Sequence, residues 1–204
     1  MSATTLSRAS GLTLLLGALL YIVGGILTYA SLPITPLWLV TTGMWISGMA
    51  LLLLGLPGIV ARQATRAGWL GFVGFLLLFL GWLLLTGFYI VDDLILSSWL
   101  DSLAPHVYAQ WFLNPAATVS VHVAFSLVGV GGALLGIATL RARVFSRWSG
   151  LLLVAGGVAG VASFVSGSLT TVATVLIVIG LGSMGQVLWA APGEAAAVLQ
   201  PAPF

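Results

Sequence analysis

Apolar runs long enough to cross a bilayer follow one another along most of the sequence, separated only by short segments with proline or arginine. A helix needs about 20 apolar residues to cross a hydrocarbon core about 30 Å thick. Only 5% of the 204 residues are charged, and the mean hydropathy is +1.20, whereas soluble domains carry roughly 25% charged residues. A water-soluble surface cannot be built from this composition. The sequence therefore predicts an all-α integral membrane protein.

The apolar runs predict a six-helix transmembrane bundle in one domain at residues 1–192, followed by a cytoplasmic tail at 193–204. The expected spans are 11–31, 36–57, 69–91, 116–140, 149–167 and 169–190. The first run is longer than the roughly 7 to 15 residues of a secretory signal core, so we interpret it as a retained helix. The last two spans are joined through residues 166–168, which predicts a close antiparallel hairpin.

The arginines predict the orientation of the bundle. All six basic residues other than histidine are arginine, and they fall in alternate loops: Arg8, Arg62, Arg66, Arg141, Arg143 and Arg147. Short loops rich in arginine stay in the cytoplasm, so both termini are expected there. The opposite side carries Asp92, Asp93 and Asp101. A net charge of +2 is too small for a nucleic-acid-binding surface, so no nucleic acid is expected as a partner.

Three expected spans begin with similar residues, at 7–12, 65–70 and 146–151. Each stretch has a hydroxyl residue and an arginine, then glycine and leucine as the span starts. One interpretation is three pseudo-repeated helical hairpins that arose by duplication. The other is that any helix beginning at the cytoplasmic face selects these residue types. The sequence leaves both interpretations open.

Glycines recur at spacings that place small residues on one helix face. Gly132 and Gly136 are one such pair, and Gly156 and Gly160 are another. In lipid, small residues let helix backbones approach closely and gain packing contacts. We interpret both pairs as helix-packing positions within the bundle, in preference to a dimerisation surface.

The longest expected loop, residues 92–115, contains most of the candidate ligand residues. Its apolar spacing predicts a short amphipathic helix that Pro105 ends. The candidate metal or ligand residues are His122, His106, Asp92, Asp93 and Asp101. His122 is the one titratable group expected inside a span, roughly 10 Å below the start of its helix.

His122 has several interpretations. The one we favour is structural, with the neutral imidazole hydrogen-bonded to a serine or threonine. The alternatives are metal or haem ligation, proton transfer and ligand binding. No metal-binding motif matches the spacing, so no cofactor is predicted, and haem or metal at His122 stays an alternative. Without cysteine or lysine, disulfides, thiolate metal sites and Schiff-base chemistry are excluded.

A stretch in the middle of the chain resembles a known group of proteins. Residues 54–71 read LGLPGIVARQATRAGWLG, and an arginine-flanked hairpin follows at residues 141–150. Both are similar to poorly characterised bacterial multi-pass inner-membrane proteins, a group with no assigned reaction. The resemblance implies a place in the bacterial cytoplasmic membrane and transfers no site residues.

These observations favour a non-catalytic membrane protein: an accessory or scaffold subunit, or a binder of lipid or another hydrophobic molecule. Membrane lipids are the expected partners, with a membrane protein or a second copy of this chain as further candidates. One alternative is a transporter or channel for a neutral or small solute, past Tyr21, Trp82, Thr86 and Ser126. The expected spans carry no charge at their centres, which argues against ion coupling. Another alternative is a haem- or metal-binding protein centred on His122.

Overall fold

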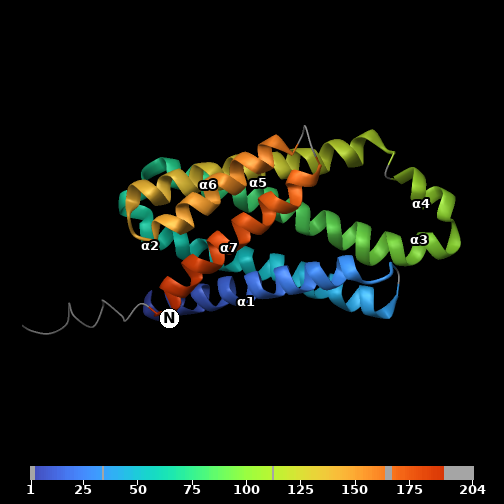
Figure 1. The fold of residues 1–204 in the computed structure, drawn as a ribbon, viewed down its shortest axis with the longest axis horizontal. Helices are drawn as coiled ribbons and strands as arrows, with labels where there is room; N and C mark the ends of the chain where they lie inside the picture. Colours follow the sequence, from blue (N-terminus) through green and yellow to red (C-terminus); the bar gives the residue numbers. More distant parts are fainter. Residues whose placement is uncertain (1–2, 34, 112, 164–166, 191–204) are drawn as a thin grey trace, which may run out of the picture.

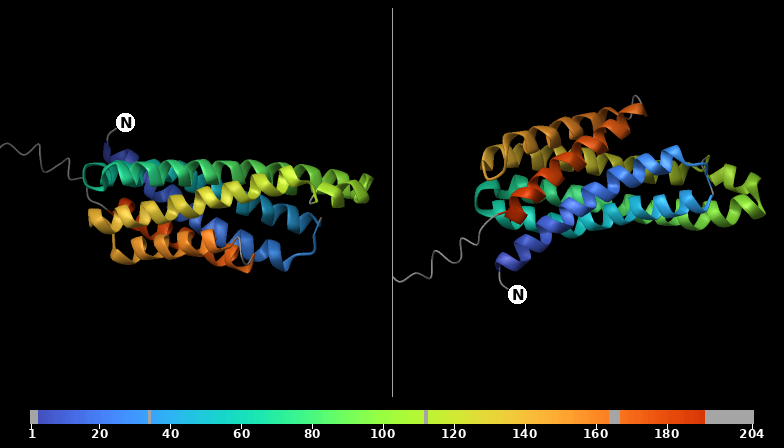
Figure 2. Two further views of the ribbon diagram at one scale, coloured as in Figure 1. Left: turned by 90° about the horizontal axis from the view of Figure 1, so that it is seen from above. Right: turned by 60° about the horizontal axis from the view of Figure 1, so that its bottom comes forward.

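The computed structural model describes residues 3–33, 35–111, 113–163 and 167–190, and within these ranges the chain is helical without strands. Four long helices dominate: α1 (Ala3–Ala30), α2 (Pro36–Tyr89), α5 (Pro115–Ala142) and α7 (Ser168–Ala190). The others are η1 (Ile90–Leu96), α3 (Ser97–Leu103), α4 (Pro105–Trp111) and α6 (Arg147–Ala162). Figures 1 and 2 show an elongated bundle whose long helices run mostly along its long axis.

Four helical segments of the described residues are long and apolar enough to cross a membrane, and α6 is a shorter apolar helix. Large apolar side chains also cover the outside of the bundle, Leu54 and Trp69 among them. Such a surface is disfavoured in water but matches the hydrocarbon core of a bilayer. The described part of the chain is therefore helical, with four helices suited by length and composition to span a membrane.

Helix α2 folds back on itself at Gly68. The backbone there is non-helical, with φ 59° and ψ −160°, a region that is essentially reserved for glycine. A straight helix would hold Trp45 and Tyr89 about 66 Å apart, yet their ring centroids lie 4.7 Å apart. Helix α2 therefore consists of two antiparallel arms, a first arm at residues 36–67 and a second arm at 69–89 (Figure 1). Pro57 lies within the first arm, where a span end was expected.

The second arm does not end near residue 91, because the helix continues through η1 and α3 to Leu103. Ala104 leaves the helical region with φ −151° and ψ 68°, as expected of a residue before proline. The region expected as a loop with one short helix thus contains η1, α3 and α4. The expected turn at 166–168 falls partly outside the described residues, and the expected tail at 193–204 lies wholly outside them.

Small residues hold neighbouring helices in close contact. A Cβ atom added at Gly131 of α5 would overlap the backbone of Leu78 in the second arm of α2. Gly74 likewise faces the backbone of Leu135, and Gly11 of α1 faces Trp189 of α7. Four predicted packing glycines lie at such contacts: Gly132 and Gly136 on α5, against α7 and α6, and Gly156 and Gly160 on α6, against α7 and α5.

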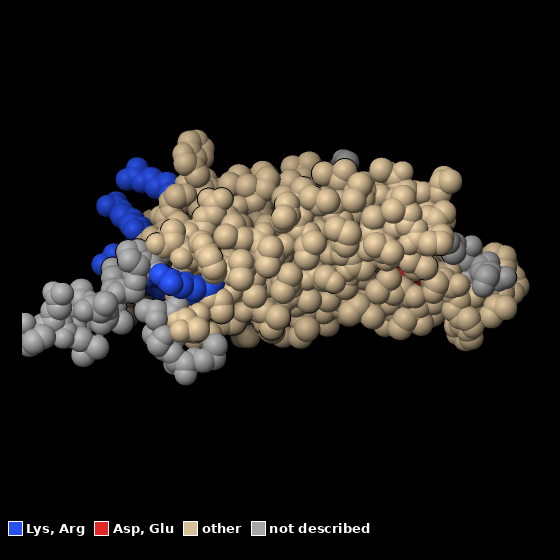
Figure 3. All heavy atoms as spheres, turned by 90° about the horizontal axis from the view of Figure 1, so that it is seen from below, with Lys and Arg blue, Asp and Glu red and all other residues tan. Residues whose placement is uncertain are grey.

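The arginines gather at one end of the bundle, as the space-filling view shows for one face (Figure 3). They lie at the start of α1, before the reversal of α2, and around the turn from α5 to α6. A buried hydrogen bond joins two of these regions, because the Thr139 hydroxyl donates to Gln63 Oε1 at 3.1 Å. The reversal of α2 and the end of α5 are thereby fixed to each other.

We predict that Gly131→Ala lowers the stability of the folded bundle by about 1 to 3 kcal/mol, because the new methyl group has no space against the Leu78 backbone. The matched control is Gly43→Ala, since a Cβ atom at Gly43 meets no atom within 4 Å. Thermal unfolding in detergent measures both variants. Equal melting temperatures for the two would contradict the tight packing of α2 against α5.

Candidate functional site: an aromatic cavity between α1 and α7

A cavity of about 540 Å³ lies between α1, both arms of α2, α5 and α7. We call it the aromatic cavity. Its lining consists of Tyr21, Ile22, Gly25, Ile26, Tyr29 and Ala30 of α1, Trp45, Met49, Trp82, Leu85 and Tyr89 of α2, Phe125 of α5, and Thr170, Thr171, Thr174 and Val175 of α7. None of these side chains carries a formal charge at neutral pH. The cavity is therefore suited to a mainly apolar occupant.

Four aromatic rings form one wall of the cavity. The ring centroid of Tyr21 lies 5.8 Å from that of Trp45 and 6.4 Å from that of Trp82, and Trp45 in turn lies 4.7 Å from Tyr89. The rings are tilted or edge-on to one another, which are the arrangements that aromatic pairs prefer. Since the rings come from α1 and from both arms of α2, the reversal at Gly68 is what assembles this wall.

Threonines from α7 supply polar groups to the lining. The hydroxyl of Thr174 donates to the backbone carbonyls of Thr170, at 3.0 Å, and Thr171, at 3.1 Å. A hydroxyl that donates within its own helix keeps its oxygen as an acceptor. The threonines thus offer a few weak acceptors without the cost of a buried charge.

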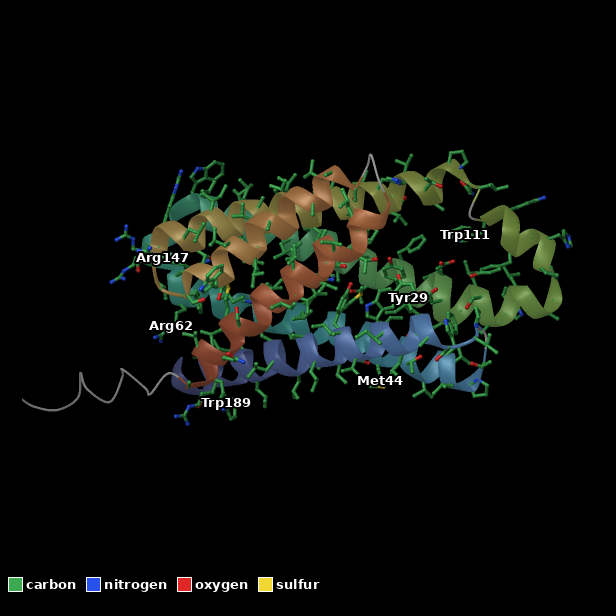
Figure 4. The ribbon with its side chains drawn as sticks, viewed as in Figure 1. Tyr29, Met44, Arg62, Trp111, Arg147 and Trp189 are labelled. Atoms are coloured by element: carbon green, nitrogen blue, oxygen red, sulfur yellow. The ribbon has the colours of Figure 1, made fainter. Side chains whose placement is uncertain are left out.

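The cavity extends from the centre of the bundle to its surface. Trp82 is 1% exposed, whereas Ile26 and Tyr29, which line the same cavity, are 63% and 78% exposed. Glycines hold α7 against α1 at one end, where Gly182 meets Ala18. The two helices diverge toward the other end (Figure 1), and Figure 4 shows Tyr29 there. The cavity therefore reaches the surface of the bundle near the end of α1 and the start of α7.

Of the four cavity-lining residues predicted from the sequence, two line the aromatic cavity and two do not. Tyr21 and Trp82 are part of its wall. Thr86 is buried and donates to the carbonyl of Trp82 at 2.8 Å, and Ser126 donates to the carbonyl of His122 at 2.6 Å. Neither residue is part of the cavity lining.

The sequence reasoning missed Trp45, Tyr89 and the threonines of α7 as lining residues. One feature of the sequence could have identified Trp45. Trp45 lies deep within its expected span, as Trp82 does, although tryptophan in membrane proteins favours the interface with water. A tryptophan away from that interface is a candidate for a wall inside the bundle.

The candidate ligand residues separate into distinct places. His122 is exposed on α5, and its Nδ1 lies 2.6 Å from the backbone carbonyl of Thr118. Because a carbonyl only accepts, Nδ1 carries the proton in this contact. Asp92 of η1 is buried, and it lines the same small pocket as His122.

The other candidates do not line that pocket. Asp93 is half-buried beside Asp92, and its backbone carbonyl accepts a hydrogen bond from Ser97. His106 is exposed on α4, and the side chain of Asp101 lies outside the described part of the chain. No group of three or more His, Cys, Asp or Glu that could hold a metal ion occurs among the described residues.

No known protein family, curated protein or solved structure matches this chain. Chemically, the aromatic cavity presents ring faces, aliphatic side chains and a few hydroxyl oxygens. Its lining residues include no carboxylate, imidazole or amine, and such an arrangement can bind and orient an apolar molecule.

We predict that Trp82→Ala destabilises the bundle by about 3 kcal/mol or more, because a fully buried indole is lost. Tyr29→Ala changes the same cavity at its exposed end and should cost less than about 1 kcal/mol. Thermal unfolding of the two variants in one detergent compares them. A larger loss of stability for Tyr29→Ala than for Trp82→Ala would contradict the central packing role of Trp82.

Proposed function

We propose that the protein is a non-catalytic membrane protein that binds a lipid chain or another hydrophobic molecule in the aromatic cavity. One observation carries the proposal: the cavity runs from buried Trp82 to exposed Tyr29, and residues of α1 and α7 line it where it reaches the surface. In a bilayer, an opening between two apolar helices faces lipid. An apolar molecule can then enter sideways without crossing water.

The size and lining of the cavity support this proposal. Binding sites for small molecules commonly measure about 300 to 1,000 Å³ and are lined by apolar and aromatic side chains with a few polar groups. The aromatic cavity, at about 540 Å³, falls in this range. Its hydroxyls offer one or two hydrogen bonds to the polar end of a lipid-like molecule, and its rings offer broad faces to an acyl chain or a fused ring system.

We further propose that the chain crosses the bacterial cytoplasmic membrane six times, with the arginine-rich end in the cytoplasm. The two arms of α2 then count as separate crossings, and α6 counts as one although it has 16 residues. The positive-inside rule supports this orientation because the arginines gather at one end of the bundle. The resemblance of residues 54–71 to bacterial inner-membrane proteins supports the location.

We predict that Gly25→Leu weakens the binding of a dansyl-labelled fatty acid by about tenfold or more, equivalent to about 1.4 kcal/mol. A Cβ atom at Gly25 meets only the Trp45 ring, at 3.6 Å, so the larger side chain extends into the cavity. Energy transfer from tryptophan to the dansyl group in detergent measures the affinity.

The matched control is Gly43→Leu, which adds the same side chain to α2 at a position with open space. It should bind the probe as the unaltered protein does. If Gly25→Leu binds as tightly as this control, or if the unaltered protein binds no probe, the aromatic cavity is not the site of a hydrophobic ligand.

We predict that single cysteines report the orientation directly, because the chain has no cysteine of its own. Leu113 is exposed between α4 and α5, and Ala64 is exposed near the reversal of α2. In intact bacterial cells, a membrane-impermeant maleimide should label Leu113→Cys, and it should label Ala64→Cys only after permeabilisation. The reverse pattern would overturn the proposed orientation, and labelling of both in intact cells would overturn the number of crossings.

A further inference from the structure

A second pocket, of about 280 Å³, lies where η1, α4 and α5 meet. Five of its lining residues can engage a polar ligand: Tyr89, Asp92, Trp111, Thr118 and His122. We call it the Asp92 pocket. Only Tyr89 also lines the aromatic cavity, so the Asp92 pocket is a separate site with a different chemical character.

Two polar groups in this pocket have unmet hydrogen-bonding capacity. Asp92 is 4% exposed, and its Oδ1 atom has no hydrogen-bond partner among the described residues. The indole Nε1 of Trp111 likewise has no partner at ordinary hydrogen-bond distance, and it faces the Asp92 carboxyl as a donor. A buried polar atom without a partner costs free energy, more so when it carries charge, and native structures usually satisfy such atoms with water, an ion or a ligand.

The arginines of the chain do not serve as the counter-charge for Asp92. They gather at the opposite end of the bundle, and Figure 4 shows Arg62 and Arg147 there, far from Trp111. Two other titratable side chains line the pocket, Tyr89 and His122, and the Nδ1 of His122 is engaged with the carbonyl of Thr118. A cation from outside the chain would complete the site.

We propose that the Asp92 pocket binds an organic ammonium group, which pairs with Oδ1 of Asp92 and lies against the rings of Tyr89 and Trp111. A cation over an aromatic face is attracted by the ring quadrupole, and a carboxylate beside the ring adds an ion pair. The ammonium group belongs either to a free alkylamine or to the headgroup of an aminophospholipid. This site stands independently of the aromatic cavity.

A bare metal ion fits the pocket less well. The described residues bring no third acidic or imidazole ligand to Asp92 and His122, and the rest of the lining consists of aromatic, alkyl and hydroxyl groups. Metal ions prefer a shell of several oxygen or nitrogen ligands. An ammonium group needs only one carboxylate, and the aromatic rings in the rest of the lining attract it.

The experiment titrates the purified protein, in a neutral detergent, with octylammonium chloride and measures binding by calorimetry. A parallel titration uses 1-octanol, an uncharged probe of equal chain length. Asp92→Asn keeps the shape of the side chain and removes its charge. It should weaken octylammonium binding by about tenfold or more and leave octanol binding unchanged. The matched control is Asp93→Asn, because Asp93 neighbours Asp92 but does not line the pocket. It should behave as the unaltered protein.

Trp111→Leu is a second variant, for the case that Asp92→Asn fails to fold. Loss of the ring should weaken octylammonium binding several-fold and affect octanol less. The proposal is overturned if octylammonium binds no more tightly than octanol to the unaltered protein. It is also overturned if the two aspartate variants lose affinity equally. Either outcome leaves Asp92 satisfied within the chain, for example by the Trp111 indole.

Native mass spectrometry distinguishes the two sources of the ammonium group. The protein is reconstituted with phosphatidylethanolamine or with phosphatidylglycerol and then released into detergent. Retention of phosphatidylethanolamine by the unaltered protein, and not by Asp92→Asn, assigns the site to the lipid headgroup. Octylammonium binding without such retention assigns it to a free amine. If the protein retains phosphatidylglycerol as well as phosphatidylethanolamine and binds no octylammonium, both sources of the ammonium group are contradicted.

Discussion

The structure depends on how closely its helix backbones can approach. Lipid chains are as apolar as leucine, so burial of apolar surface does not by itself drive these helices together. Glycines do so instead, since Gly131 admits the backbone of Leu78 and Gly182 admits Ala18. Toward the other end of α1 and α7 the facing residues are Tyr29 and the threonines of α7, and there the aromatic cavity lies between them. The distribution of small and large residues therefore decides both where the bundle is closed and where it is hollow.

Much of the fold could be predicted from the sequence because its strongest signals are local. Long apolar runs predicted a helical membrane protein, and the arginines predicted which helix ends lie together. The reversal at Gly68 falls between the second and third expected spans, beside Arg66. The extension of helix past residue 91 was harder to predict, because Asp92 and Asp93 suggested an exit from the membrane. Nothing in the backbone chemistry interrupts a helix there before Ala104 and Pro105.

The candidate site was predictable only in part, and the reason is the uniform surface of these helices. In a soluble protein an apolar stripe marks the face that is buried. Here apolar residues surround every long helix, so the sequence does not show which face looks inward. Tyr21 and Trp82 were identifiable because aromatic residues with polar tips are unusual deep in a span. Thr86 looked equivalent in the sequence, yet it is buried outside the cavity lining. The placement of Tyr89 in the wall follows from the rotation of the second arm of α2, which only the packed structure reveals.

The Asp92 pocket reflects a separation of charge along the bundle. The arginines lie at one end and Asp92 lies toward the other, so no arginine of the chain neutralises this aspartate. The centre between them holds rings and hydroxyls. Tyr89 lines both pockets, so a substitution there changes the lining of each.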